Sequence, residues 1–139
     1  MSVDLRTHCF LDNLQPQHAA YLGTVRAGCR VVSVADSFSA AELAKRMEIG
    51  GARAVVTVHA YRRGGREIAL YPRVREAFGR LPDAGLAIVV GPGRLEAGDV
   101  AWEDFLSSRE SGEGFVASPD HVTNVLFSSG TTGTPKAIP

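Results

Sequence analysis

Residues 122–136 read VTNVLFSSGTTGTPK, and this stretch decides the fold because an apolar strand runs directly into a loop of glycines and hydroxyls. The apolar composition of residues 122–127 is typical of a buried strand. Residues 128–136 contain two glycines, five hydroxyl side chains and one lysine. Glycine lets successive backbone N–H groups turn toward one anion, and the hydroxyls and the lysine ammonium add donors. The composition therefore favours a loop that wraps around a polyphosphate.

Three further segments upstream have the composition of short, buried strands. They are residues 30–34, Ala54–Val58 and Leu86–Val90. Segments with helical spacing of apolar residues lie between them. Strands that alternate with helices predict an α/β fold with a largely parallel sheet flanked by helices. A glycine loop at the carboxyl end of a strand is also where open α/β sheets usually bind ligands.

Four helices are predicted from apolar residues spaced three and four apart. The first ends at Gly28, a typical helix-terminating glycine. The second begins with a capping box, in which Ser39 precedes Glu42 by three residues, and it ends at Gly50-Gly51. On its outer face Glu42 and Arg46 are four residues apart and form a supporting pair. The predicted inner faces are Ala19, Leu22, Val25 and Cys29; Ala40, Leu43, Ala44 and Met47; Leu70, Val74, Ala77 and Phe78; and Trp102, Phe105 and Leu106.

Composition excludes several classes of protein. The 139 residues suffice for one compact domain, and 15 basic residues balance 15 acidic ones, so nothing favours a nucleic-acid or membrane-surface partner. No apolar run approaches the roughly 20 residues of a membrane span, and acidic Asp4 argues against a signal peptide. Cys9 and Cys29 are too few for a disulfide framework. We interpret them as thiols of a reducing, cytoplasmic environment.

The nine residues SSGTTGTPK closely resemble the phosphate-binding loop of the adenylate-forming superfamily, which includes acyl-CoA synthetases, luciferases and adenylation domains. The longer string VLFSSGTTGTPKAIP is similar to the acetyl-CoA-synthetase-like branch. Residues 20–57 also resemble the helix, strand, turn and second helix of such enzymes. The resemblance covers residues 16–139 and implies a partial AMP-binding N-terminal domain. Residues 1–15 form a divergent segment, because they match neither the strand nor the Met-Pro turn that the family has there.

The resemblance implies a two-step reaction with ATP, Mg²⁺ and coenzyme A. A carboxylic acid, acetate or propionate by the branch resemblance, would attack the α-phosphorus of ATP, and coenzyme A would then displace AMP from the acyl-adenylate. The loop residues would line the β- and γ-phosphates, and Lys136 would partly neutralise them. The implied loop residues are Ser128, Ser129, Gly130, Thr131, Thr132, Gly133 and Thr134. The resemblance places no catalytic residue and no metal ligand within this chain.

The chain ends at Pro139, whereas the relatives continue for several times this length. The resemblance implies that the adenine site, the acyl pocket and the C-terminal domain lie beyond residue 139. We therefore expect the 139-residue polypeptide alone to be catalytically inactive. We also expect an unpaired sheet edge at residues 122–127, which would favour self-association.

Other interpretations of the glycine loop fit less well. A P-loop of the G-x-x-x-x-G-K-[ST] type fails because Pro135 precedes the lysine and Ala137 stands where a magnesium-binding hydroxyl is needed. A plain solvated turn needs fewer hydroxyls and no lysine. A short non-catalytic protein that binds nucleotide or a partner stays open, and the coding DNA beyond the last codon distinguishes it from a synthetase.

Two other groups of polar residues have simpler interpretations than a binding site. His8, His18, His59 and His121 are scattered without the spacing of a zinc site, so we expect surface or partly buried neutral histidines. Residues 61–67 and 109–119 are polar and predicted as loops. The first of these carries Arg62, Arg63 and Arg66, which suit a phosphate or coenzyme A, although a solvated basic loop explains them more simply.

Overall fold

A computed structural model describes residues 6–10, 15–83, 85–107, 112–128 and 135–139 of the chain. It contains a seven-stranded sheet of order β7-β6-β3-β1-β2-β8-β9 and a separate two-stranded sheet of β4 and β5. The elements are β1 (Arg6–Phe10), α1 (Gln15–Arg26), β2 (Arg30–Ser33), α2 (Ala40–Gly50), β3 (Ala54–Val58), β4 (Ala60–Arg63), β5 (Arg66–Ala69), α3 (Tyr71–Phe78), β6 (Leu86–Val90), β7 (Val100–Ala101), α4 (Trp102–Ser107), β8 (Asn124–Ser128) and β9 (Lys136–Ile138).

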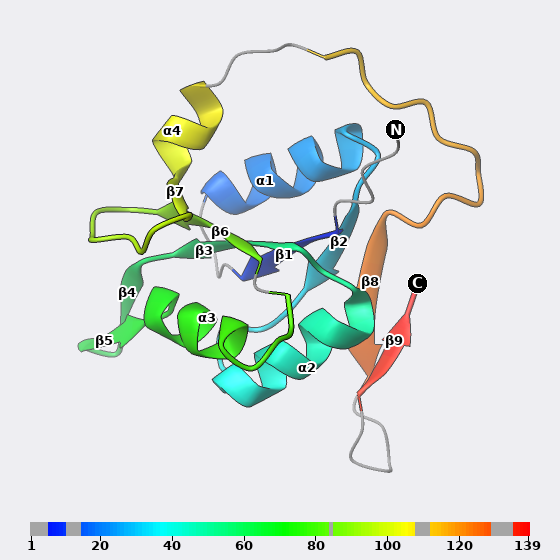
Figure 1. The fold of residues 1–139 in the computed structure, drawn as a ribbon. Helices are drawn as coiled ribbons and strands as arrows, with labels where there is room; N and C mark the ends of the chain where they lie inside the picture. Colours follow the sequence, from blue (N-terminus) through cyan, green and yellow to red (C-terminus); the bar gives the residue numbers. More distant parts are fainter. Residues whose placement is uncertain (1–5, 11–14, 84, 108–111, 129–134) are drawn as a thin grey trace.

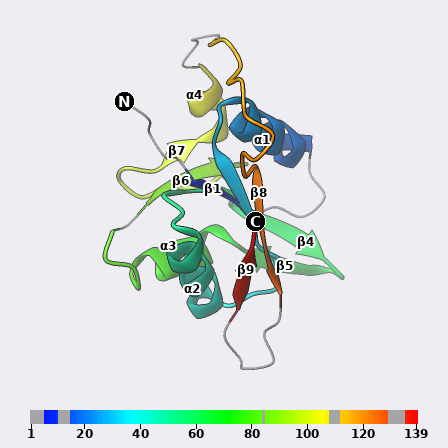
Figure 2. The same ribbon diagram turned by 90° about the vertical axis from the view of Figure 1, so that its right-hand side faces the viewer.

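The large sheet lies between two layers of helices. Helices α1 and α4 cover one face, and α2 and α3 cover the other (Figure 1; from the side in Figure 2). Every strand pair in this sheet is parallel except β8 with β9. The predicted α/β fold with a largely parallel sheet flanked by helices is therefore confirmed. No described helix is long and apolar enough to cross a membrane.

The centre of the core is β3, in which all five residues are buried. Helices on both faces of a parallel sheet explain why its sequence, AVVTV, is almost continuously apolar. The predicted strands at Ala54–Val58 and Leu86–Val90 have the predicted bounds. The strand expected at residues 30–34 is one residue shorter, and the strand expected at residues 122–127 begins two residues later and includes Ser128.

The expectation that residues 1–15 contain no family-like strand was wrong. Residues Arg6–Phe10 form β1, which lies in the middle of the sheet and pairs in parallel with β2 and β3. The sequence RTHCF has no apolar run, so its composition did not indicate a strand in the sheet. Its position between two apolar strands decides its conformation, because tertiary context outweighs intrinsic β-propensity.

Helix α1 shows a different inner face from the predicted one. Leu22 is 65% exposed and Ala19 is also exposed, whereas Ala20 is buried and Tyr21 and Val25 pack against the core. The stripe was therefore placed on the wrong side of the helix except for Val25. The predicted terminating glycine is confirmed.

The end of α1 has the hydrogen bonds of a Schellman motif. Gly28 has a φ of 75°, its N–H donates to the Val25 carbonyl at 2.9 Å, and the Cys29 N–H donates to the Thr24 carbonyl at 3.0 Å. A left-handed residue at this position favours glycine. The turn directs the chain straight into β2.

Helix α2 follows its predicted caps and inner face. The Ser39 hydroxyl accepts a hydrogen bond from the Glu42 N–H at 3.3 Å, and Gly51 ends the helix with a φ of 62°. All four predicted inner residues are buried, namely Ala40, Leu43, Ala44 and Met47. The pairing of Glu42 with Arg46 is confirmed, but Arg46 is buried and does not lie on an outer face.

Helices α3 and α4 and residues 61–67 agree only in part with the predictions. The α3 stripe is buried, at Leu70, Val74, Ala77 and Phe78. In α4 Trp102 is buried, but Phe105 and Leu106 are 43% and 55% exposed, so the expected core-facing stripe was wrong for these two residues. Residues 61–67, predicted as a loop, contribute to the antiparallel hairpin β4–β5. Gly64 and Gly65 turn this hairpin with φ values of 57° and 77°, as a type I′ turn requires.

Candidate functional site

The two ends of the predicted phosphate loop lie opposite each other, at the end of the β8–β9 hairpin where the loop connects the two strands. Ser128 is the last residue of β8, Lys136 is the first residue of β9, and the two are paired in the antiparallel register. The structure therefore brings together the two predicted site residues that it describes. The other six lie outside the described residues: Ser129, Gly130, Thr131, Thr132, Gly133 and Thr134.

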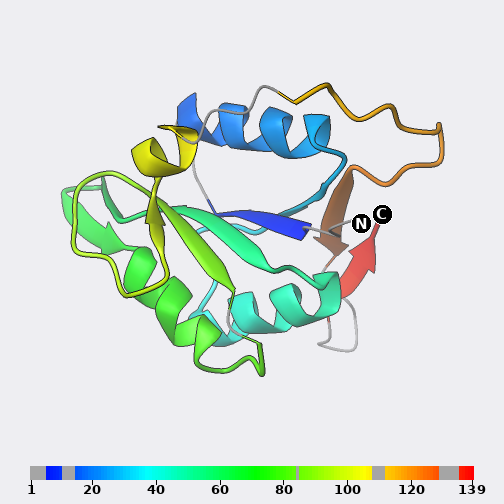
Figure 3. The ribbon, with the colours of Figure 1, turned by 45° about the horizontal axis from the view of Figure 1, so that its top comes forward.

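The hairpin lies at the carboxyl edge of the parallel sheet. Strand β8 runs parallel to β2, with Asn124 opposite Val31 and Val125 opposite Val32. The carboxyl end of β8 therefore lies on the same edge of the sheet as the carboxyl ends of β2, β1 and β3 (Figure 3). Crevices at this edge are the usual ligand sites of open α/β sheets.

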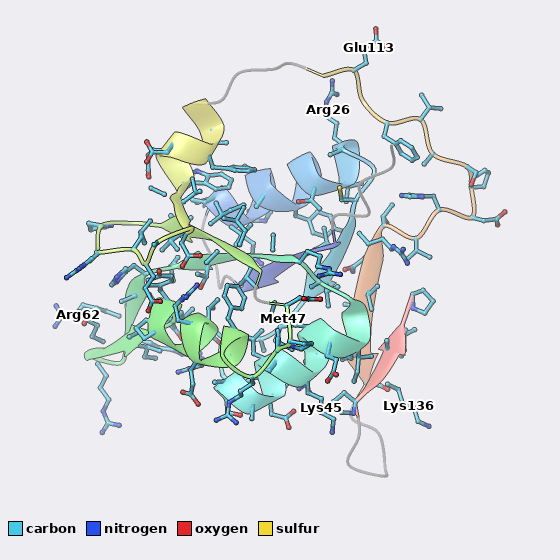
Figure 4. All side chains as sticks on the ribbon, viewed as in Figure 1. Arg26, Lys45, Met47, Arg62, Glu113 and Lys136 are labelled. Carbon is cyan, nitrogen blue, oxygen red and sulfur yellow. The ribbon has the colours of Figure 1, made fainter. Side chains whose placement is uncertain are left out.

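Lys136 is exposed, and its side chain points away from the sheet (Figure 4). The preceding residue, Pro135, is buried. A buried proline with its fixed φ holds the chain just before the lysine. The backbone at this position is therefore anchored while the ammonium group stays accessible to an anion.

The expected unpaired edge at residues 122–127 was wrong, because β9 covers that side of β8. The edge of the sheet is β9 itself, and Lys136, Ala137 and Ile138 are all exposed. This returning strand has only three residues between two prolines, too few for a periodic pattern. The sequence therefore gave no signal for it.

A buried arginine, Arg46, lies close to Phe127 of the β8–β9 hairpin. The guanidinium carbon of Arg46 is 3.9 Å from the centre of the Phe38 ring and 5.6 Å from the centre of the Phe127 ring. Its Nη1 donates to the Glu42 carbonyl at 3.0 Å and also to the Glu42 carboxylate. That hydrogen bond lowers the pKa of Glu42, although burial acts in the opposite direction. The contact with Phe127 could not be predicted from the sequence, because it joins residues far apart in the chain.

The turn after β2 is fastened by side chains from the hairpin β4–β5 and from α3. The Tyr61 hydroxyl donates to the Asp36 carboxylate, and this bond raises the pKa of Tyr61. Arg73 donates through Nη1 to the Phe38 carbonyl at 3.2 Å and to the Asp36 carbonyl. Phe38, which faces Arg46, therefore belongs to a firmly held turn.

The structure shows neither a metal-binding cluster among the described residues nor a buried place for the arginines of residues 61–67. Among the described residues, no three His, Cys, Asp or Glu side chains come together to hold a metal ion. Arg62, Arg63 and Arg66 are exposed on the hairpin β4–β5, and Figure 4 shows Arg62 at the periphery of the molecule. Their exposure agrees with a solvated basic segment.

Comparison with known proteins identifies the family. Residues 8–139 match the family described as AMP-binding enzyme. The chain belongs to the AMP-binding enzyme family. The match begins inside β1, which agrees with the central place of that strand in the sheet. The predicted resemblance to adenylate-forming enzymes is confirmed.

The chain is similar to named proteins of several organisms. The chain is 46% identical over 130 residues to a probable peroxisomal acyl-activating enzyme 18 of Arabidopsis thaliana, covering 86% of this chain and 18% of that protein. It is 42% identical over 130 residues to a hexanoyl-CoA synthase of Cannabis sativa, covering 86% and 17%. It is 34% identical over 125 residues to an acetyl-coenzyme A synthetase of Methanothrix soehngenii, covering 86% and 19%.

A solved structure supports the same assignment. The acetoacetyl-CoA synthetase from Streptomyces lividans superposes with a TM-score of 0.84 at 31% identity, covering 96% of this chain and 21% of that one. The predicted similarity to the acetyl-CoA-synthetase-like branch is thus confirmed. The chain spans about a fifth of the length of the proteins it matches.

Proposed function

We propose that this chain supplies the triphosphate-binding loop of an ATP-dependent acyl-CoA synthetase. In that reaction a carboxylate attacks the α-phosphorus of ATP and releases pyrophosphate, and coenzyme A then displaces AMP from the acyl-adenylate. The observation that carries the proposal is the pairing of Ser128 with Lys136 at the carboxyl edge of the sheet. Membership of the AMP-binding enzyme family supports it.

The loop contributes binding and charge neutralisation. We propose that its backbone N–H groups and hydroxyls donate to the β- and γ-phosphates and that the exposed Lys136 ammonium approaches them from β9. The proposed residues are Ser128, Ser129, Gly130, Thr131, Thr132, Gly133, Thr134 and Lys136. The first step brings a carboxylate to a polyanion and separates pyrophosphate, so positioning and electrostatic stabilisation account for most of the catalysis.

The hydroxyl-rich loop also fits a magnesium ion carried by the nucleotide. Hydroxyl and phosphate oxygens suit Mg²⁺, which usually binds through few protein ligands and several phosphate oxygens. When bound, Mg²⁺ supplies charge neutralisation on the phosphate oxygens. We propose coenzyme A as the second substrate and assign no residue of this chain to it.

The proposed acid is a short aliphatic carboxylate such as acetate or propionate. Relatives named for acetyl-CoA and acetoacetyl-CoA support a short chain, whereas one named for hexanoyl-CoA extends the range to a six-carbon acid. Hexanoate therefore belongs in the assay beside acetate and propionate.

We also propose that the 139-residue polypeptide is inactive by itself, since it has about a fifth of the length of those enzymes.

The proposed cellular location is the cytoplasm. The Arabidopsis relative is named as peroxisomal, so the two compartments are the alternatives. Fluorescence of a tagged full-length product in the native host distinguishes diffuse signal from signal in organelles.

We further propose that β9 mediates self-association of the chain. Its three residues are exposed, and Ile138 and the neighbouring Leu126 are 51% and 52% exposed. An uncovered edge strand can pair with a second copy. Size-exclusion chromatography of the 139-residue chain is expected to show species larger than a monomer, and a single monomeric peak over a range of concentrations would contradict the proposal.

The decisive experiment is pyrophosphate exchange. The coding sequence on both sides of this chain is read first, and the longest continuous product is expressed. We expect exchange of labelled pyrophosphate into ATP that depends on one of the three acids. Lys136→Ala is expected to reduce the rate by roughly 10²-fold or more, as loss of a transition-state donor does. The control Arg80→Ala removes an exposed cation of a surface ion pair and should leave the rate unchanged.

The outcome also decides between the synthetase and the alternative function. No exchange with any acid, together with calorimetric binding of Mg·ATP that Lys136→Ala abolishes, would favour a non-catalytic nucleotide-binding protein. Equal exchange in the wild type and the Lys136 variant would refute the assignment of the loop.

A further inference from the structure

We propose that Arg46 is a positioning residue for the triphosphate-binding loop. The Arg46 guanidinium contacts the Phe127 ring and so fixes the backbone positions of Ser128 at the end of β8 and Lys136 at the start of β9. This inference rests on the proposed function, because it concerns the same loop. Among the described residues, Arg46 donates hydrogen bonds to Glu42 and not to the ends of the loop, so it acts through the aromatic ring of Phe127.

The burial of Arg46 is unusual for a helix residue paired with a neighbour one turn away. Arg46 is 7% exposed, although arginine side chains are almost never buried unless they are paired. Its carboxylate partner Glu42 is 45% exposed at the side chain. An ion pair between these two residues forms equally well at the surface, where the guanidinium keeps its hydration. The pair alone therefore does not explain why Arg46 is buried.

The aromatic neighbours supply the explanation. The guanidinium carbon of Arg46 lies 3.9 Å from the centre of the Phe38 ring and 5.6 Å from the centre of the Phe127 ring, close enough to interact with both rings. A planar guanidinium over a ring face is attracted by the negative π-cloud, and a dry environment strengthens this attraction. Arg46 thus links the turn before α2 to the last residues of β8.

Of the two aromatic residues that Arg46 contacts, Phe38 is held in place by α3, and Phe127 lies next to the loop. Phe38 lies in the turn that Arg73 holds through the Phe38 carbonyl. Phe127 immediately precedes Ser128 and pairs with Ala137, the residue after Lys136. A displacement of the Phe127 backbone therefore moves both ends of the loop together. Figures 1, 2 and 3 all show α2 beside the β8–β9 hairpin, consistent with this linkage.

The geometry of Arg46 permits this role without a second hydrogen-bonding partner on β8. Its Nη1 is held by Glu42, while its Nε has no hydrogen-bond partner among the described residues. The orientation of the guanidinium therefore depends on Glu42 and on the two rings. Removing the Arg46 charge or the Phe127 ring should therefore make the backbone of the β8–β9 hairpin around Phe127 less well held, to a similar extent.

The test compares four variants of the longest continuous product in pyrophosphate exchange. Arg46→Met keeps length and apolar volume but removes the charge, Arg46→Lys restores the charge, Phe127→Leu removes the ring, and Arg80→Met is a control on exposed α3-side surface. We expect Arg46→Met and Phe127→Leu each to raise the KM for Mg·ATP roughly tenfold, since small misplacement of a binding group is costly. The KM for the acid should stay unchanged, and Arg46→Lys should recover part of the loss.

Hydrogen–deuterium exchange without nucleotide provides a readout that does not need activity. Arg46→Met should accelerate amide exchange in peptides that cover residues 124–138 and leave α3 unchanged. If the Mg·ATP KM and this exchange both match the wild type, the proposal is overturned. Acceleration that extends equally through α3, with both KM values raised, would also overturn it, because Arg46 would then be a general structural residue.

The failure of the proposed function is distinguishable from the failure of this inference. If the wild type neither exchanges pyrophosphate nor binds Mg·ATP, the proposed function fails, and hydrogen exchange alone decides whether Arg46 holds the hairpin. Should Arg46→Met not fold, Arg46→Lys and Phe127→Leu carry the same two measurements.

Discussion

The centre of the sheet and the β8–β9 hairpin are built in opposite ways. In β3 every residue is buried, and helices cover the sheet on both faces. In the hairpin Leu126 and Ile138 are more than half exposed, and Lys136 reaches solvent. Burial of apolar surface stabilises the first region, whereas the second leaves its polar groups accessible. The difference shows that this chain separates the stable scaffold from the segment we propose to bind ATP.

A buried carboxylate, Asp99, lies in the scaffold with its hydrogen-bond donors, and removing it should have the largest effect on stability. The Asp99 side chain is 1% exposed, accepts hydrogen bonds from the Tyr71 hydroxyl at 2.6 Å and the Ala87 N–H at 3.0 Å, and pairs with Arg75 at 3.3 Å. Asp99→Ala leaves these two donors without their acceptor and removes one of the two carboxylates that pair with Arg75, while Glu96 stays in place. We expect a loss of about 3–5 kcal/mol in the free energy of unfolding.

Urea unfolding followed by the fluorescence of buried Trp102 measures this loss. The matched control is Asp83→Ala, whose carboxylate is 73% exposed and pairs with Arg53 at 3.2 Å. An exposed pair contributes only about 0–1 kcal/mol. Equal losses in the two variants would contradict the contrast between a buried and a solvated network.

The second comparison removes one leucine from each region. Leu43 on α2 is 0% exposed, and Leu126 on β8 is 52% exposed. Leu43→Ala creates a cavity and should cost about 2–5 kcal/mol, whereas Leu126→Ala should change stability by no more than about 0.5 kcal/mol. The same urea titration measures both. A loss of more than about 2 kcal/mol for Leu126→Ala would show that the hairpin is part of the cooperative core.

The scaffold was more predictable from sequence than the hairpin for a physical reason. Strong apolar patterns, as in Ala54–Val58 and the inner face of α2, follow directly from burial between layers. Glycines at Gly28 and Gly51 were predictable because each occupies a left-handed conformation that other residues resist. In these places local preference and tertiary packing agree.

The predictions from sequence failed where tertiary packing alone determines the conformation or the burial of a residue. Strand β1 has no apolar run, and β9 has only three residues, so pairing with neighbours gives both their conformation. Arg46 was expected on an outer face because charged residues usually are, but the rings of Phe38 and Phe127 offset its desolvation. For the candidate site, the sequence predicted Ser128 and Lys136. It did not predict that a returning strand would place them face to face.

A smaller effect is expected at the start of α2, which connects the two regions. The Ser39 hydroxyl accepts the Glu42 N–H, so Ser39→Ala leaves that donor to water and should cost about 1 kcal/mol. Ser37→Ala changes an exposed serine two residues away and serves as the control. Urea midpoints compare the two variants, and equal midpoints would show that the cap contributes nothing measurable.

The smallest expected effect is a pH dependence that arises from Glu42. The Arg46 hydrogen bond lowers the pKa of Glu42 below its ordinary value of 4.5. A carboxyl group whose pKa is lower in the folded state stabilises the fold above its unfolded pKa. That contribution is lost as the pH falls through the folded-state pKa.

The difference in stability between the wild type and Glu42→Gln isolates this carboxyl group, because every other acidic residue titrates in both proteins. We expect the wild type to be more stable at about pH 7 and the difference to shrink as the pH falls below 4.5, measured by urea unfolding. A difference that stays constant down to about pH 3 would mean that Arg46 does not depend on the charge of Glu42. In that case the two aromatic rings alone would hold the guanidinium beneath the hairpin, and the link between scaffold and loop would be insensitive to acid.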